Sequence, residues 1–197
     1  MSPIQLHFLT LEKKCKDRDL TLIEIFDSFG PDGHYVIILF MILPFLQPIP
    51  MLGLSTPFGF LMGAISILAY LNKPPYLPQR WKNKKISSVM VLKITIGFEK
   101  IFNKISFIIH PRWPMFFTHP VRIFNTILIV ANCIALALPI PIPFTNTLPA
   151  YAIFTMTLAL LEDDGFLVLL SYLLSVLTVI YFVLITRGLE SGLRVLF

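Results

Sequence analysis

Prolines interrupt an otherwise apolar stretch at residues 136–162, and this interruption limits the possible folds more than any other feature of the chain. The four prolines are Pro139, Pro141, Pro143 and Pro149. Because proline lacks an N–H and disfavours helix in the preceding residue, residues 138–148 are predicted to be extended. A helix is predicted to follow, with Thr147 as its N-cap and Pro149 in its first turn.

The break carries polar side chains where an embedded backbone would need them. Apolar sequence on both sides predicts that the break lies at membrane depth, where each freed N–H and C=O must find a partner within the protein. Thr145, Asn146 and Thr147 are the polar residues of the break. They either satisfy this backbone or bind a polar headgroup or sugar, and the sequence leaves both interpretations open.

Composition indicates an integral membrane protein. Of the 197 residues, 56% are hydrophobic and only 14% are charged, which is too apolar for a soluble domain of this size. Neither Cys15 nor Cys133 lies in a CxxC or metal-binding pattern, so both are predicted to be structural thiols. The chain has no serine-nucleophile, phosphate-loop or zinc motif, and we therefore predict no enzymatic activity, cofactor or metal.

Hydropathy and charge divide a single membrane domain into five segments. The first is expected to form amphipathic surface helices, with a capping box at Thr21 and Glu24. Two membrane hairpins of short, proline-broken helices follow, separated by a basic interfacial segment. An acidic turn then leads to one full transmembrane helix at residues 166–186. In order, the segments are residues 1–33, 34–71, 72–120, 121–161 and 162–197. The predicted fold is an all-α integral membrane protein.

The two hairpins resemble each other, which predicts an internal repeat. Pro48 and Pro50 break the first hairpin as Pro139 and Pro141 break the second. Thr56 follows Pro48 at the same spacing at which Thr147 follows Pro139. A further similarity is that Asp32-Gly33 precedes one apolar run and Asp164-Gly165 precedes another. Such pairs of interrupted short helices are typical of transport folds with a site near the membrane midplane. Ser55 and Thr56 would then join the residues of the second break in a candidate polar site.

Small and polar residues recur on the faces of the predicted helices. The pairs are Gly59 with Gly63, Ser171 with Ser175, and Asn125 with Asn132. Small residues four apart permit close helix approach in lipid, and the asparagines are predicted to form interhelical hydrogen bonds. Self-association of the chain, most simply as a homodimer, is expected from these faces.

The middle segment is basic. Between residues 72 and 121 the acidic residue Glu99 stands alone among many lysines and arginines, so the positive-inside rule places this segment in the cytoplasm. Residues 93–110 predict an amphipathic helix whose basic face carries Lys93, Lys100 and Lys104. The apolar stripe opposite favours an anionic lipid surface as the partner, and no nucleic acid is predicted.

Glu162, Asp163 and Asp164 form the densest acidic group next to apolar sequence. They are candidates for a cation or proton site, because acids beside membrane helices often lie on ion paths. The interpretation we favour is a solvated turn whose acids stabilise the N-terminus of the next helix. If both hairpins return to the cytoplasm, Arg187 and Arg194 lie outside, against the positive-inside rule, and the sequence does not resolve this conflict.

Several motifs together resemble the ExoD family of bacterial exopolysaccharide-synthesis membrane proteins. They are Thr21-Leu22 with Glu24, Leu43-Pro44 leading to Pro48-Ile49-Pro50, residues 53–59, Pro75-Tyr76-Leu77-Pro78, residues 143–150 and Glu162-Asp163-Asp164-Gly165. The resemblance extends over about residues 20–186. It implies a multi-pass protein of the bacterial inner membrane that takes part in exopolysaccharide production and, in some members, alkaline tolerance. It carries over no catalytic residues.

Two functions fit these observations. In the first, which we favour, the broken hairpins form a midplane site that transports a small ion or a lipid-linked glycan. In the second, the protein is a non-transporting membrane scaffold for exopolysaccharide-synthesis proteins, held by its basic helix. Two proline breaks in apolar segments are costly, and a scaffold has no need of them.

Overall fold

A computed structural model describes most of the chain. The described residues are 20–21, 24, 28–47, 53–73, 85–88, 96, 109–138, 140, 142 and 144–196. The prolines Pro48, Pro50, Pro139, Pro141 and Pro143, the basic residues Lys93, Lys100 and Lys104, and Cys15 lie outside the described residues.

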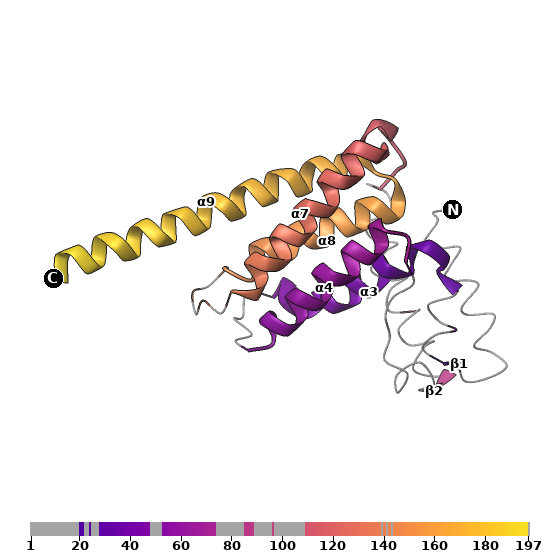
Figure 1. Ribbon diagram of the computed structural model, residues 1–197, viewed down its shortest axis with the longest axis horizontal. Coiled ribbons are helices and arrows are strands. Elements are labelled where there is room, and N and C mark those ends of the chain that lie inside the picture. Colours follow the sequence, from indigo (N-terminus) through magenta and orange to yellow (C-terminus); the bar gives the residue numbers. More distant parts are fainter. Residues whose placement is uncertain are drawn as a thin grey trace.

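Helices make up nearly all of the described structure (Figure 1). The elements are β1 Leu20–Thr21, η1 Gly30–Asp32, α3 Gly33–Ile42, η2 Leu43–Leu46, α4 Ser55–Tyr70, β2 Lys85–Ile86, η3 Pro114–Phe117, α7 His119–Ala137, α8 Thr147–Glu162 and α9 Gly165–Leu196. The small antiparallel ladder, in which Leu20 faces Ile86 and Thr21 faces Lys85, is not predicted by the sequence. The capping box is confirmed, because the Thr21 N–H donates to the Glu24 carboxylate at 2.9 Å and the Glu24 N–H donates to the Thr21 hydroxyl at 3.4 Å.

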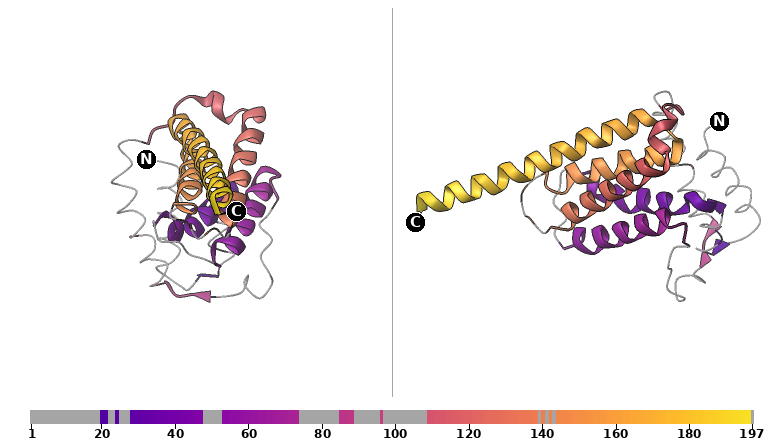
Figure 2. Two further views of the ribbon diagram at one scale, coloured as in Figure 1. Left: turned by 90° about the vertical axis from the view of Figure 1, so that its left-hand side faces the viewer. Right: turned by 45° about the horizontal axis from the view of Figure 1, so that its top comes forward.

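The helices form a bundle in which α4 packs against α3 and α7, and α8 packs against α3, α7 and α9. We call the end at which α7 begins and α8 finishes the clamp end, and the end at which η2 and α7 finish the break end. The long helix α9 starts at the clamp end and continues well past the rest of the bundle (Figure 2). Arg187 therefore lies far from the clamp end, on the opposite side of the bundle.

Close packing of α4 against α7 explains the glycine spacing in α4. A Cβ atom added at Gly59 would lie 2.6 Å from the Cys133 carbonyl oxygen, so only glycine permits this approach. A Cβ atom at Gly63 would lie 3.5 Å from the Cys133 Cβ, which is an ordinary contact. The predicted close approach is confirmed, and its partner is a helix of the same chain.

The predicted asparagine contacts are confirmed as links between α7 and α9. Tyr172 donates its hydroxyl to the Asn125 side-chain oxygen at 2.6 Å, and the Asn132 amide donates to Ser175 Oγ at 2.9 Å. Ser171 Oγ donates to the Ala152 carbonyl on α8 at 2.8 Å. The serine pair of α9 thus faces its own bundle.

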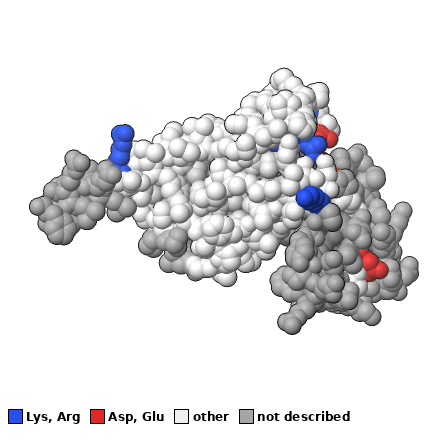
Figure 3. Space-filling model, in the orientation of Figure 1, with Lys and Arg blue, Asp and Glu red and all other residues white. Residues whose placement is uncertain are grey.

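Among the described helices, two are long and apolar enough to cross a membrane: His119–Ala137 and Gly165–Gly188. The predicted C-terminal apolar helix is confirmed as a helix long and apolar enough to span a membrane, and it is part of a longer helix of 32 residues. Three shorter apolar helices, Gly33–Leu46, Ser55–Tyr70 and Thr147–Glu162, complete the bundle. On the face seen in Figure 3, charged atoms of the described residues lie toward the two ends of the molecule, with an uncharged surface between them. This distribution is typical of a protein embedded in lipid.

Candidate functional site

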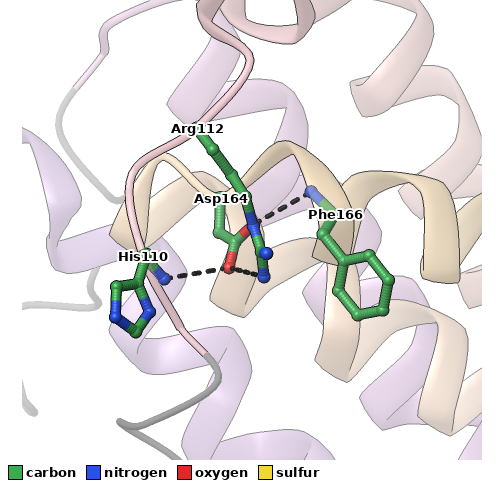
Figure 4. A network of polar contacts seen from close by, with 4 residues as sticks. All are labelled: His110, Arg112, Asp164 and Phe166. Carbon is green, nitrogen blue, oxygen red and sulfur yellow. Dashed lines mark hydrogen bonds and ion pairs between the residues drawn. The ribbon is translucent and has the colours of Figure 1, made fainter.

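At the clamp end, the carboxylate of Asp164 accepts hydrogen bonds from Arg112, His110 and Phe166 (Figure 4). Its side chain is fully buried. Arg112 binds it in a bidentate manner, with Nε 2.7 Å from Oδ1 and Nη2 3.0 Å from Oδ2. The backbone N–H groups of His110 and Phe166 donate to it at 3.1 and 2.9 Å. One buried acid thereby joins the segment before α7 to the start of α9.

Backbone contacts hold the two segments in register. The Arg112 N–H donates to the Asp163 carbonyl at 3.1 Å, and the Gly165 N–H donates to the Arg112 carbonyl at 2.9 Å. A Cβ atom at Gly165 would lie 2.8 Å from the Trp113 Cβ and 2.9 Å from the Arg112 carbonyl oxygen. The Asp-Gly sequence is therefore needed here for two reasons: the acid binds Arg112, and the glycine lets the chains approach.

The ion pair determines the charge state of both groups. Burial by itself raises the pKa of the Asp164 carboxyl, but the hydrogen bonds from Arg112, His110 and Phe166 outweigh burial and bring the pKa below the ordinary value of 3.8. The hydrogen bond to Asp164 raises the pKa of the Arg112 guanidinium. The guanidinium also lies 4.8 Å from the centre of the Phe166 ring, in a cation–π contact.

The acidic turn is only partly the solvated turn that we favoured from the sequence. Asp163 is exposed and ends α8 in a left-handed conformation, with φ of 52°. Asp164 and Glu162 are 0% and 1% exposed, so the solvated interpretation is wrong for both. The predicted help to the next helix is confirmed, since Asp164 accepts the hydrogen bond from Phe166 in the first turn of α9.

We call α3 with α4, and α7 with α8, the two helix pairs. At the break end, one threonine of each pair donates a hydrogen bond to a backbone carbonyl of the other pair. Thr56, at the start of α4, donates to the Ala137 carbonyl at the end of α7, at 2.7 Å. Thr147, at the start of α8, donates to the Gln47 carbonyl just after η2, at 3.1 Å. Each threonine thus satisfies a carbonyl at the end of a helix in the other pair.

The third threonine satisfies the backbone of its own break. Thr145 Oγ1 donates to the carbonyls of Ile140 and Ile142, at 3.1 and 2.7 Å. Leu138 is extended, as predicted, but Phe144 adopts a left-handed conformation with φ of 67°. The N-cap position of α8 is Asn146, one residue before the predicted one, and Pro149 lies in the first turn as expected.

Ser55 and Asn146 differ from the threonines. They are 1% and 5% exposed, and Ser55 Oγ and Asn146 Oδ1 have no hydrogen-bond partner among the described residues. An unsatisfied buried polar group costs about 1–3 kcal/mol. Both lie at the start of a helix, Ser55 in α4 and Asn146 next to α8, where the helix dipole is positive.

The structure separates the two groups of predicted site residues. The polar residues of the breaks lie at one end of α8 and the three acids at the other, and its 16 residues correspond to about 24 Å of helix. Sequence reasoning missed Arg112 as the partner of Asp164, although a buried acid in a membrane protein requires a cation or donors nearby. In the described part of the chain, no group of histidine, cysteine and acidic side chains could hold a metal ion.

These features define a helical protein with two helices apolar enough to span a membrane, three shorter apolar helices and a buried Arg–Asp pair at one end. A family model described as "Exopolysaccharide synthesis, ExoD" matches residues 6–184. The chain belongs to the ExoD family, and membership implies a role in exopolysaccharide synthesis.

Two relatives support this assignment. The chain is 31% identical to Protein ExoD of Rhizobium meliloti over 166 residues, which are 83% of this chain and 69% of the relative. It is 33% identical to an uncharacterized protein of Synechocystis over 144 residues, which are 72% of this chain and 67% of the relative. No solved structure matches the chain.

Proposed function

We propose that this protein is a non-enzymatic, multi-pass protein of the bacterial inner membrane that transports a lipid-linked glycan or a small ion during exopolysaccharide synthesis. The observation that carries the proposal is the pair of buried oxygen atoms, Ser55 Oγ and Asn146 Oδ1, which lack partners among the described residues. A ligand group with matching hydrogen bonds would offset their desolvation when it binds.

The similarity of the two sequence motifs supports this proposal. Thr56 and Thr147 hold corresponding positions in the two sequence motifs and make corresponding hydrogen bonds to the opposite helix pair. Ser55 and Asn146 immediately precede them and are therefore also equivalent. We infer that the two helix pairs are related by a pseudo-twofold axis along the bundle, and that α4 and α8 direct their N-termini toward a shared site.

The electrostatics of this site favour an anionic group. Helix N-termini carry partial positive charge and bind phosphate, whereas Glu162, Asp163 and Asp164 lie at the opposite end of α8. A phosphate-bearing, lipid-linked glycan therefore fits better than a cation: its phosphate suits the helix N-termini, and a glycan hydroxyl can donate to Asn146 Oδ1, which only accepts hydrogen bonds. The 19 residues of α7 correspond to about 28 Å, so the proposal places the site near the far boundary of a hydrocarbon core of about 30 Å.

A non-transporting scaffold is the second candidate. Because Gly59 faces α7 and Ser171 faces α8, those small-residue faces are occupied within the chain. The scaffold proposal then rests on residues 176–184 of α9, whose large apolar side chains are largely exposed, and on the basic segment that would bind anionic lipid. The exposed large apolar residues in this part of α9 are Val176, Leu177, Val179, Ile180, Val183 and Leu184. They offer a surface for synthesis proteins or for a second copy of the chain.

Thiol accessibility tests the transport proposal. In a background lacking Cys15 and Cys133, Ser55→Cys and Asn146→Cys variants would be treated in sealed vesicles with a small, membrane-impermeant thiol reagent. A water-filled site predicts that both positions are labelled, and from the same side of the membrane. Transport of a lipid-linked glycan in proteoliposomes would be measured with Ser55→Ala and Asn146→Ala.

A matched control uses Thr157→Cys, because Thr157 is fully buried within α8 and donates to the Ile153 carbonyl. This position should stay unlabelled in the folded protein. If Ser55→Cys and Asn146→Cys are as unreactive as Thr157→Cys, water does not reach the breaks. The transport proposal would then be contradicted, and the scaffold proposal would be favoured.

A further inference from the structure

A polar pocket opens at the clamp end, between the starts of α3 and α7 and the end of α8. Its volume is about 210 Å³. At about 30 Å³ for each water molecule in the liquid, it holds roughly seven waters. The lining residues are Asp32, Tyr35, Phe117, Arg122, Leu160, Leu161 and Asp163. Three segments distant in sequence thus converge on one small cavity.

The polar groups of the pocket are of mixed charge. Tyr35 is 7% exposed, and its hydroxyl lies within hydrogen-bonding reach of the Arg122 guanidinium. The Asp163 carboxylate forms no hydrogen bond or ion pair with any described residue, and Asp163 lines the pocket. Asp32 adds a second carboxylate from the start of α3. Two acceptor groups, one donor and one group that does both therefore line the cavity.

This combination argues against a simple ion. Arg122 disfavours a metal cation, and the two carboxylates disfavour phosphate or another anion. A neutral ligand with many hydroxyl groups avoids both repulsions, because each hydroxyl both donates and accepts. Such a ligand would donate to Asp163 and accept from Arg122, while Phe117 offers an apolar face.

We propose that this pocket binds a single sugar ring through its hydroxyl groups, with Asp163, Arg122 and Tyr35 as the recognising side chains and Phe117 against the C–H face of the ring. The volume lies below the 300–1,000 Å³ typical of pockets for drug-sized ligands, which favours one ring over an oligosaccharide. The inference rests on the proposed function at one point: it takes the bound sugar ring to be part of the lipid-linked glycan. The positive-inside rule places the basic segment in the cytoplasm. Because this segment joins α4 to α7 at the clamp end, we take the pocket to face the cytoplasm.

Saturation-transfer NMR on the full chain in nanodiscs tests the proposal, with methyl β-D-glucopyranoside and methyl β-D-galactopyranoside as probes. At least one should give a saturable signal. Tyr35→Phe removes a hydroxyl, and Asp163→Asn replaces a charged acceptor oxygen with an amide donor, so each variant should weaken binding about tenfold or more. Asparagine tolerates the left-handed backbone at position 163, so this variant changes the charge with little added strain.

Arg187→Gln, at the other end of α9, is the matched control and should bind like the unmodified protein. Absence of saturable binding, or displacement of the sugar by choline or inorganic phosphate, would overturn the proposal. Sugar binding without labelling of Ser55→Cys and Asn146→Cys would support the sugar pocket and contradict the transport proposal. Labelling of both variants without sugar binding would contradict the sugar pocket and still support the transport proposal.

Discussion

The buried carboxylate of Asp164 accepts hydrogen bonds from a guanidinium and from two backbone N–H groups. An isolated carboxylate in such a position would be neutralised, because burial disfavours its charged form. Its net pKa is lowered, which means that its partners stabilise the charged form more than burial destabilises it. Asp164 thus forms a structural ion pair with Arg112. This role accounts for its burial and its charge, so the hypothesis from the sequence that Asp164 takes part in ion movement is not needed to explain them.

The sign of this pKa shift predicts how stability depends on pH. A folded-state pKa below the unfolded value means that Asp164 stabilises the fold fully above about pH 4. This contribution is lost as the pH falls through the folded-state pKa. Asp164→Asn should therefore lower the free energy of unfolding by about 1–3 kcal/mol at pH 7, and the deficit should shrink as the pH falls below about 4.

Thermal unfolding in detergent, followed by tryptophan fluorescence, measures this difference. Asp163→Asn is the matched control, because Asp163 is exposed and makes no ion pair with a described residue. An Asp164→Asn deficit that is the same at pH 3 and pH 7 would contradict the assignment of a charged, paired Asp164.

At the scale of the helix pairs, the α4–α7 contact depends on one glycine more than on the other. Gly59→Ala places a Cβ atom 2.6 Å from the Cys133 carbonyl oxygen, and this backbone atom cannot move without displacing α7. Overpacking of this kind costs about 1–3 kcal/mol. Gly63→Ala meets only an ordinary contact at 3.5 Å and should be tolerated or slightly stabilising, because alanine favours helix.

The measurement is the melting temperature of both variants in the same detergent. Equal melting temperatures would show that the GxxxG face does not determine how closely α4 and α7 approach. A loss at Gly63→Ala alone would place the tight contact one turn further along the helix than the structure does.

For the whole molecule, the length and direction of α9 predict that its two ends lie on opposite sides of the membrane. Thr118 is exposed just before α7 at the clamp end, and Gly188 is exposed beyond the break end. In sealed vesicles, Thr118→Cys and Gly188→Cys should react with an impermeant thiol reagent from opposite sides. By the positive-inside rule, Thr118→Cys should be the cytoplasmic one.

Arg187 would then lie outside, against the same rule, as the sequence already indicated. The basic segment outnumbers the two C-terminal arginines and would determine the orientation. Labelling of both variants from one side would mean that α9 does not cross the membrane.

Local sequence was sufficient to predict much of this fold. The final apolar run predicted a helix long enough to span a membrane, the capping box at Thr21 and Glu24 formed as expected, and Pro149 lies in the first turn of α8. The motifs were sufficient to identify the family. These features depend on residues close together in the chain, so that apolar length, proline geometry and capping act without reference to distant partners.

Other features were decided by tertiary packing. Arg112 is 52 residues from Asp164, and many basic residues precede α7, so no local pattern singles out one of them as the partner. The pocket at Asp32, Tyr35 and Arg122 likewise forms only when three distant segments meet. Burial decides whether an acid is a solvated cap or a paired charge, and burial depends on how the helices pack.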